Sequence, residues 1–346
     1  MFENKERTSL TELGEFGLIK HLTEHFKIAH ESSVKGVGDD SAVLNFDHKQ
    51  VLISTDLLLE GIHFDLAYVP LMHLGYKAVQ VNLSDIYAMN GMATQITVSL
   101  GVSSKFPLEA IEEIYKGIAL ACNKFNIDLV GGDTSASRQG LVISVTSIGY
   151  AEKDDVVYRN GAQEGDLLCV SGDLGGAYVG LQILEREKQI FLENPQLQPD
   201  LEGKDYIIER QLKPEGRKDM VDLLAQLKIK PTAMIDVSDG LASEILHICN
   251  QSEKGCTIYE DKLPIDPMTY ETARELGLDP TVCALNGGED YELLFTIKQS
   301  DYQKLKNDID VSIIGHITDK NEGVKMISKS NVVHELKAQG WNAFKK

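Results

Sequence analysis

The chain has 346 residues, 42% hydrophobic and 25% charged, a composition typical of a globular protein long enough for two domains. Its 53 acidic and 34 basic residues give a net charge of -19, which argues against DNA or RNA as a partner because a polyanion would be repelled. Five cysteines without a CxxC pair, no apolar stretch of about 20 residues and no secretory apolar segment near the N-terminus predict a cytoplasmic protein that binds no membrane.

The first half of the chain predicts alternating helices and strands. Thr11 can cap an opening helix whose apolar stripe reaches Leu22, and a glycine-rich turn, VKGVGDDSAVLNF, follows it. Strands are expected at 50–55, 94–102, 127–130 and 141–149, and helices at 70–89 and 108–125. The strand at 127–130 is expected to stop at Gly131-Gly132.

The second half predicts a further mixture of strands and helices after a polar stretch at 151–166. Strands are expected at 167–171, 257–258, 293–297 and 312–314, and helices at 175–186, 220–227 and 241–250. Residues 194–204, within the longer segment 190–204, are polar and proline-bearing and predict a surface loop. The sequence therefore predicts a two-domain α/β (α+β) protein, with domains at 1–150 and 151–346.

Aspartates recur beside glycine and hydroxyl residues, and we interpret these places as turns that follow apolar strands. The segments are Gly38-Asp39-Asp40, Ser54-Thr55-Asp56, Asn82-Leu83-Ser84-Asp85, Gly131-Gly132-Asp133-Thr134, Asp236-Val237-Ser238-Asp239-Gly240 and Gly287-Gly288-Glu289-Asp290. One such segment is equally well explained as a local turn, because aspartate and glycine form turns for purely local reasons. Six of them favour sites for Mg²⁺, which prefers carboxylate oxygens, phosphates and water.

The chain lacks the GxxxxGK[ST] phosphate loop and the HRDxxxxN loop of protein kinases. We therefore expect phosphates to be held mainly through metal ions, as suits phosphoryl transfer. Arg159 is a candidate for a direct phosphate contact, or else a surface arginine. His63 and Tyr115 have structural alternatives, and Trp341 either covers an apolar edge or stacks on a flat ring.

In order and spacing, the motifs GVGDDSAVL, STDLLLEGIHF, NLSDIYAMNG, GGDTSAS, DVSDGL and GGEDYELLF resemble those of the thiamine-monophosphate kinase family. The resemblance runs from Glu15-Phe16 to Gly340-Trp341. It implies an N-terminal domain that binds ATP and metal and dimerises through its sheet, and a C-terminal domain that closes the cleft. It also implies Mg²⁺-assisted transfer of the ATP γ-phosphoryl group to thiamine monophosphate, the last step of thiamine diphosphate biosynthesis.

The resemblance also assigns site residues. The implied Mg²⁺ ligands, for several ions, are Asp40, Ser54, Thr55, Asp56, Asp85, Asp133, Asp236 and Asp239. Of these, Asp40, Asp85, Asp133 and Asp239 would carry the catalysis. The implied ATP contacts are Tyr115, Gly132, Asp133, Arg159 and Ser238, and the implied contacts to thiamine monophosphate are His63, Glu289 and Trp341.

Two alternatives stay open at this point. One is another ATP-dependent enzyme of the same superfamily, such as aminoimidazole ribonucleotide synthetase. Selenophosphate synthetase fits less well, since the first cysteine here is Cys122, and the hydrogenase maturation factor fits less well because the chain ends in Ala-Phe-Lys-Lys. The other alternative is a non-catalytic protein that binds nucleotide or metal, which the six acidic motifs disfavour.

Overall fold

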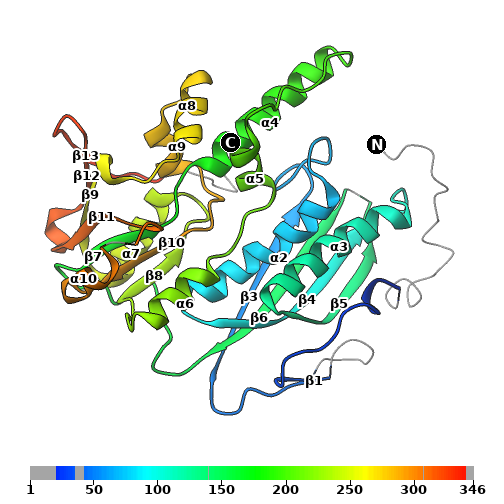
Figure 1. The fold of residues 1–346 in the computed structure, drawn as a ribbon, viewed down its shortest axis with the longest axis horizontal. Coiled ribbons are helices and arrows are strands. Elements are labelled where there is room, and N and C mark those ends of the chain that lie inside the picture. The colour runs from blue at the N-terminus through cyan, green and yellow to red at the C-terminus, as the bar shows by residue number, and fades with distance from the viewer. Residues whose placement is uncertain (1–20, 36–42, 139, 307, 340–346) are drawn as a thin grey trace. The chain divides into compact units, whose positions relative to one another are not determined.

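The computed structural model describes residues 21–35, 43–138, 140–306 and 308–339 (Figure 1). They form two compact units. The first comprises residues up to Ile86 together with Gly91–Lys153, and the second comprises Tyr87–Asn90 together with the chain from Asp154 onward.

The first unit is built on a four-stranded sheet of order β3-β6-β4-β5. Its strands are β3 (Gln50–Leu59), β4 (Met92–Val102), β5 (Asp128–Ala136) and β6 (Val142–Ala151). β3 pairs antiparallel with β6 along its whole length, and β4 and β5 run parallel. A short ladder of β1 (Ser33–Lys35) and β2 (Val43–Leu44) completes the described strands of this unit.

Two helices, α2 (Leu71–Ala88) and α3 (Leu108–Phe125), lie across one face of this sheet (Figure 1). They approach closely through glycines. A Cβ on Gly75 would lie 1.9 Å from the Ile114 carbonyl oxygen, and one on Gly117 would lie 1.9 Å from that of Met72. The helix backbones therefore pack at a distance that no larger residue at these two positions permits.

The other face of this sheet carries exposed side chains. Along β6 buried and half-buried residues alternate, so only one face of this strand is buried. On the edge strand β3, Val51, Ile53 and Leu57 are apolar and exposed, Ile53 by 68%. The two faces of β6 differ, because Ile143 and Val145 are buried whereas Ser144 and Thr146 on the other face are only half-buried.

The second unit contains a seven-stranded sheet of order β13-β12-β9-β11-β7-β10-β8. Its strands are β7 (Leu167–Ser171), β8 (Ala233–Asp236), β9 (Gly255–Tyr259), β10 (Leu293–Ile297), β11 (Val311–Thr318), β12 (Val324–Ile327) and β13 (Val333–Glu335). Most neighbours are antiparallel, and β9 and β12 are parallel.

Several helices of the second unit contribute to two apolar clusters. The helices are α4 (Gly176–Glu193), α5 (Asp205–Leu212), α6 (Lys218–Gln226), α7 (Leu241–Ser252), α8 (Pro267–Glu275), α9 (Pro280–Asn286) and α10 (Tyr302–Leu305). In one cluster, α7 packs on the central strands through Leu241, Ile245 and Ile248. In the other, α4, α5, α8 and α9 bury Val179, Ile207 and Cys283 together with their neighbours.

The predicted helices at 70–89, 108–125 and 241–250 are confirmed to within two residues at each end. The expected stop at Gly131-Gly132 is wrong, because β5 continues through both glycines to Ala136 and stays paired with β4 after a register shift at Val130. The helix expected at 175–186 extends to Glu193, and the surface loop predicted at 194–204 is confirmed, since no helix or strand lies there. Residues 1–20, with the helix capped by Thr11, lie outside the described residues.

Candidate active site

In the first unit, β3 and α2 bring three predicted metal ligands together. The Ser54 hydroxyl donates a hydrogen bond to Oδ2 of Asp85, and the backbone N–H of Asp56 donates to Oδ1 of Asn82 at 2.9 Å. Asn82 and Asp85 are three residues apart on α2, which places both side chains on the helix face next to β3. The interpretation of these segments as turns is wrong, because Ser54 to Asp56 lie within a strand and Asp85 lies in a helix.

The environment of Asp56 disfavours the charge of its carboxylate. Burial, and then the nearby Asp85 carboxylate, raise the pKa of Asp56 from 3.8 to about 6. A divalent cation beside them would reverse both effects. Ser54, Asp56 and Asp85 therefore have the donor atoms and the charge that a Mg²⁺ site requires.

Thr55 does not join this group. Its hydroxyl donates to the Val145 carbonyl at 3.0 Å and accepts from Thr146, and the alternation of β3 sends its side chain away from those of Ser54 and Asp56. Asp133 lies on β5 opposite Ser99 and is exposed. Its neighbour Gly132 is tightly constrained, because a Cβ there would lie 2.0 Å from the Val98 carbonyl oxygen.

His63 and Tyr115 are placed by other elements of the first unit. Nδ1 of His63 accepts a hydrogen bond from the Leu59 N–H at 3.0 Å, which fixes the imidazole beside the end of β3. Tyr115 on α3 is buried and packs edge-on against Phe26, and burial raises its pKa to about 12. The packing interpretation therefore accounts for Tyr115, and an ATP contact by this residue stays a prediction.

In the second unit, the DVSDG segment joins β8 to α7. Asp236 ends β8, in agreement with the prediction that this segment follows a strand, and its side chain is buried. The Asp239 N–H donates to Oε1 of Glu244 at 2.8 Å. Burial raises the pKa of Asp239, and the nearby His247 and Arg159 oppose this rise. Burial also raises the pKa of Glu244 to about 7, against the lowering effect of the hydrogen bond from the Asp239 N–H. The structure thus brings Arg159 and Asp239 together with Glu244.

The segment Gly287–Tyr291 packs against DVSDG backbone to backbone. The Glu289 N–H donates to the Ser238 carbonyl at 2.7 Å, and the Tyr291 N–H donates to that of Val237 at 2.9 Å. A Cβ on Gly288 would lie 2.5 Å from the Ser238 carbonyl oxygen, so only glycine fits at this position. The DVSDG and GGEDY segments, which lie about 50 positions apart in the sequence, therefore pack together as one pair.

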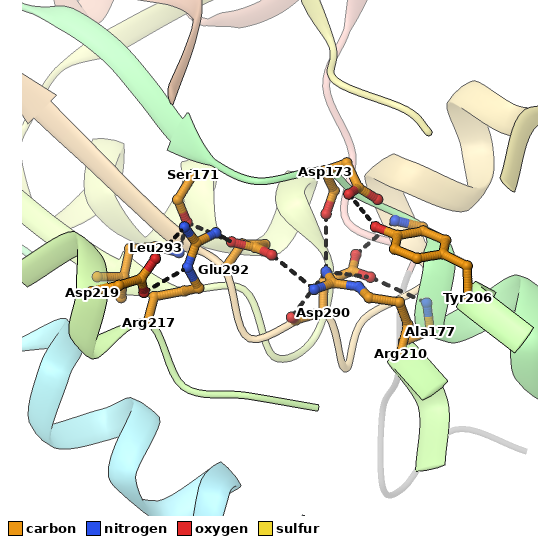
Figure 2. A network of polar contacts seen from close by, with 11 residues as sticks. Ser171, Asp173, Ala177, Tyr206, Arg210, Arg217, Asp219, Asp290, Glu292 and Leu293 are labelled. Atoms are coloured by element: carbon orange, nitrogen blue, oxygen red, sulfur yellow. Dashed lines mark hydrogen bonds and ion pairs between the residues drawn. The ribbon is translucent and has the colours of Figure 1, made fainter. Parts of the chain in front are cut away.

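A buried polar network surrounds this turn (Figure 2). Oδ2 of Asp290 accepts from the Gly175 N–H at 2.7 Å, at the positive end of α4. The Glu292 carboxylate accepts hydrogen bonds from Arg210 at 2.9 Å, from Ser171 Oγ at 2.6 Å and from Arg217. Burial raises the pKa of Asp290 to about 7, against the lowering effect of Arg210.

The sequence did not predict the roles of several of these partners. The spacing of three between Asn82 and Asp85 could have indicated that Asn82 faces β3. The place of Glu244 in the first turn of α7 could have indicated its bond to the preceding segment. Arg210 and Gln211 had no such signal, because α5 was not predicted. Among the described residues, no group of three or more His, Cys, Asp or Glu side chains converges as a metal site. Asp40 and Trp341 lie outside the described residues.

Comparison with known proteins gives the family. Residues 38–151 match the N-terminal domain, and residues 163–327 the C-terminal domain, of AIR synthase related proteins. The thiamine-monophosphate kinase of Bacillus subtilis is 34% identical over 343 residues, covering 96% of this chain and all of that protein. The chain belongs to the thiamine-monophosphate kinase family. The kinase of Aquifex aeolicus is likewise 34% identical, over 97% of this chain and 99% of its own length.

Solved structures of the thiamine-monophosphate kinase family have the same fold. AaThiL in complex with AMPPCP and TMP is 31% identical with a TM-score of 0.75, covering 99% of this chain and all of the other. The kinase of Stenotrophomonas maltophilia is 30% identical with a TM-score of 0.76, over 93% and 98% of the two chains. The hydrogenase maturation protein HypE of E. coli, at 18% identity and a TM-score of 0.73, shares the fold alone.

Proposed function

We propose that this protein transfers the γ-phosphoryl group of ATP to thiamine monophosphate, giving thiamine diphosphate and ADP. The observation that carries the proposal is the likeness, over 99% of this chain, to AaThiL solved with AMPPCP, an ATP analogue, and TMP. The acceptor already carries a phosphate that is ionised near neutral pH, so the reaction needs positioning and charge compensation more than a strong base.

We propose Mg²⁺ as the metal that the reaction requires. Ser54, Asp56 and Asp85 would hold it in the first unit, and Asp236 and Asp239 are the candidates in the second. Asp40, Thr55 and Asp133 stay predictions for the same role. When bound, the ion offsets the negative charge that builds up on the phosphate oxygens.

The remaining residues bind and orient the substrates. Arg159 lies near Asp239 and is suited to a phosphate oxygen, because its guanidinium donates in a fixed, planar fork. Ser238, Gly132 and Tyr115 stay predicted ATP contacts. Glu289, His63 and Trp341 are proposed for thiamine monophosphate, whose cationic ring suits a carboxylate and an indole.

We also propose the 1–150 and 151–346 division as functional domains, a homodimer formed through the sheet of the first unit, and a cytoplasmic location. The exposed Val51, Ile53 and Leu57 on β3 support the dimer, because a second copy would cover this apolar surface. No helix among the described residues is long and apolar enough to cross a membrane.

The test is incubation of the purified protein with ATP, Mg²⁺ and thiamine monophosphate, followed by chromatographic detection of thiamine diphosphate and ADP. Product is expected with Mg²⁺ and not in EDTA. Asp85→Asn and Asp133→Asn should lower kcat by orders of magnitude while the circular dichroism spectrum stays unchanged. Equal turnover of aminoimidazole ribonucleotide precursors, or near-normal activity in EDTA, would contradict the proposal.

A further inference from the structure

The turn Gly287–Tyr291 has a backbone that needs support. Gly288, Glu289 and Tyr291 have φ values of +73°, +58° and +53°. Two of these three residues are not glycine, and residues other than glycine rarely adopt this left-handed backbone conformation. The surrounding structure must therefore hold the turn, and through it the direction of the Glu289 side chain.

Helix α5 supplies part of that support from two consecutive residues. Nε2 of Gln211 donates to Oε2 of Glu289 at 2.9 Å. The Arg210 guanidinium donates to the Asp290 carbonyl at 3.2 Å and to Oε1 of Glu292 at 2.9 Å (Figure 2). Gln211 is 5% exposed, so its hydrogen bond is sheltered from competing water.

Helix α5 is fixed by contacts that do not involve the turn. Its backbone approaches α4 so closely that a Cβ on Gly180 would lie 2.1 Å from the Ile207 carbonyl oxygen. Lys204, just before α5, forms an ion pair with Glu275 of α8 at 2.7 Å. Tyr206 donates a hydrogen bond to Asp173. Since α5 has its own anchors, it serves as a rigid reference for the turn.

We propose that Arg210 and Gln211 are positioning residues for the acceptor substrate, acting through the turn that carries Glu289. This inference rests on the proposed function. Arg210 fixes the backbone of the turn, and Gln211 fixes the carboxylate. Because the Gln211 amide is neutral, its hydrogen bond orients Glu289 without compensating the negative charge that the cationic ring of thiamine monophosphate would meet.

Steady-state kinetics with each substrate varied in turn test the proposal. Gln211→Ala and Gln211→Met remove the amide donor, and the Met variant keeps nearly the same volume. Both should raise the KM for thiamine monophosphate about tenfold and leave that for ATP within about twofold. Arg210→Lys keeps the charge but loses the forked geometry, and it should show the same split.

The matched control is Glu209→Gln. Glu209 lies on the same helix, but its side chain forms an ion pair with Lys213 and does not contact the turn. This variant should behave as the wild type does. If Gln211→Met equals the wild type in both KM values, or raises both equally, the positioning role is wrong. If the wild-type protein itself forms no thiamine diphosphate, the proposed function is wrong, and the two failures are thereby distinguished.

Discussion

Replacing Asp56 by Asn should stabilise the metal-free protein while abolishing its activity. The pKa of Asp56 in the folded protein is about 6, against 3.8 in the absence of perturbation. A raised pKa means that folding disfavours the charged carboxylate. The loss of folding stability from this carboxylate is absent well below pH 3.8, because Asp56 is then protonated in both the folded and the unfolded protein. The loss grows as the pH rises and is complete above pH 6.

The magnitude follows from the shift. Two pKa units correspond to roughly 3 kcal/mol at about 1.4 kcal/mol per unit, and the partial exposure of Asp56 reduces this to about 1–2 kcal/mol. Asn keeps the shape of the side chain and removes its charge. Above pH 7 in EDTA, Asp56→Asn should therefore unfold a few degrees higher than the wild type, at roughly 2–4 °C per kcal/mol.

Thermal unfolding followed by circular dichroism, with EDTA or Mg²⁺ and at pH 5 and pH 8, measures this. Mg²⁺ should raise the melting temperature of the wild type more than that of Asp56→Asn, because the ion binds the folded state through this carboxylate. The difference between the two proteins in EDTA should be smaller at pH 5 than at pH 8. A variant that melts lower than the wild type in EDTA at pH 8 would refute this account of the site.

Three other predictions concern stability and substrate binding. Asp290→Ala leaves the buried Arg210 with a partner missing and should cost about 3–5 kcal/mol in urea unfolding, whereas a cost below about 1 kcal/mol would mean that the network relaxes freely. Gly117→Ala should destabilise the protein by about 1–3 kcal/mol or more, since its Cβ would overlap the Met72 carbonyl, and an unchanged urea midpoint would show that α2 and α3 can move apart. Trp341→Ala should raise the KM for thiamine monophosphate about tenfold and leave the KM for ATP nearly unchanged, because it removes a stacking contact worth roughly 1–2 kcal/mol. Equal effects on both KM values would assign Trp341 to packing.

Sequence patterns predicted the elements that have strong periodicity and clear ends. Helix α3 has an apolar stripe of the right period and is preceded by Pro107, which explains why its limits were predicted to the residue. Helix α5 was missed because it is eight residues long and only Ile207, Gln211 and Leu212 are buried. So short a stretch has too few turns to show a helical period.

Of the predicted site residues, the structure brings Ser54, Asp56 and Asp85 together, but the turns expected at these positions are wrong. Glycine beside aspartate suggested turns, yet in β5 the glycine has a different purpose. Gly132 allows the strand to approach Val98 of β4, and this tertiary contact leaves no trace in the local sequence. The link between Glu289 and Gln211 spans 78 positions along the chain, and local patterns cannot reveal such a pair.

The path of the chain between the two units matters for any attempt to study them apart. Tyr87–Asn90 belongs to the second unit, although the residues on both sides belong to the first. The Val157 N–H donates to the Met89 carbonyl at 3.2 Å, Asn90 donates to the Asp155 carbonyl at 2.9 Å, and the Tyr87 ring is fully buried. A fragment that begins at Asp154 would lose these two hydrogen bonds. A fragment with all of the second unit would have to include Tyr87–Asn90, so cutting the chain at one position cannot give two fragments that each contain one complete unit.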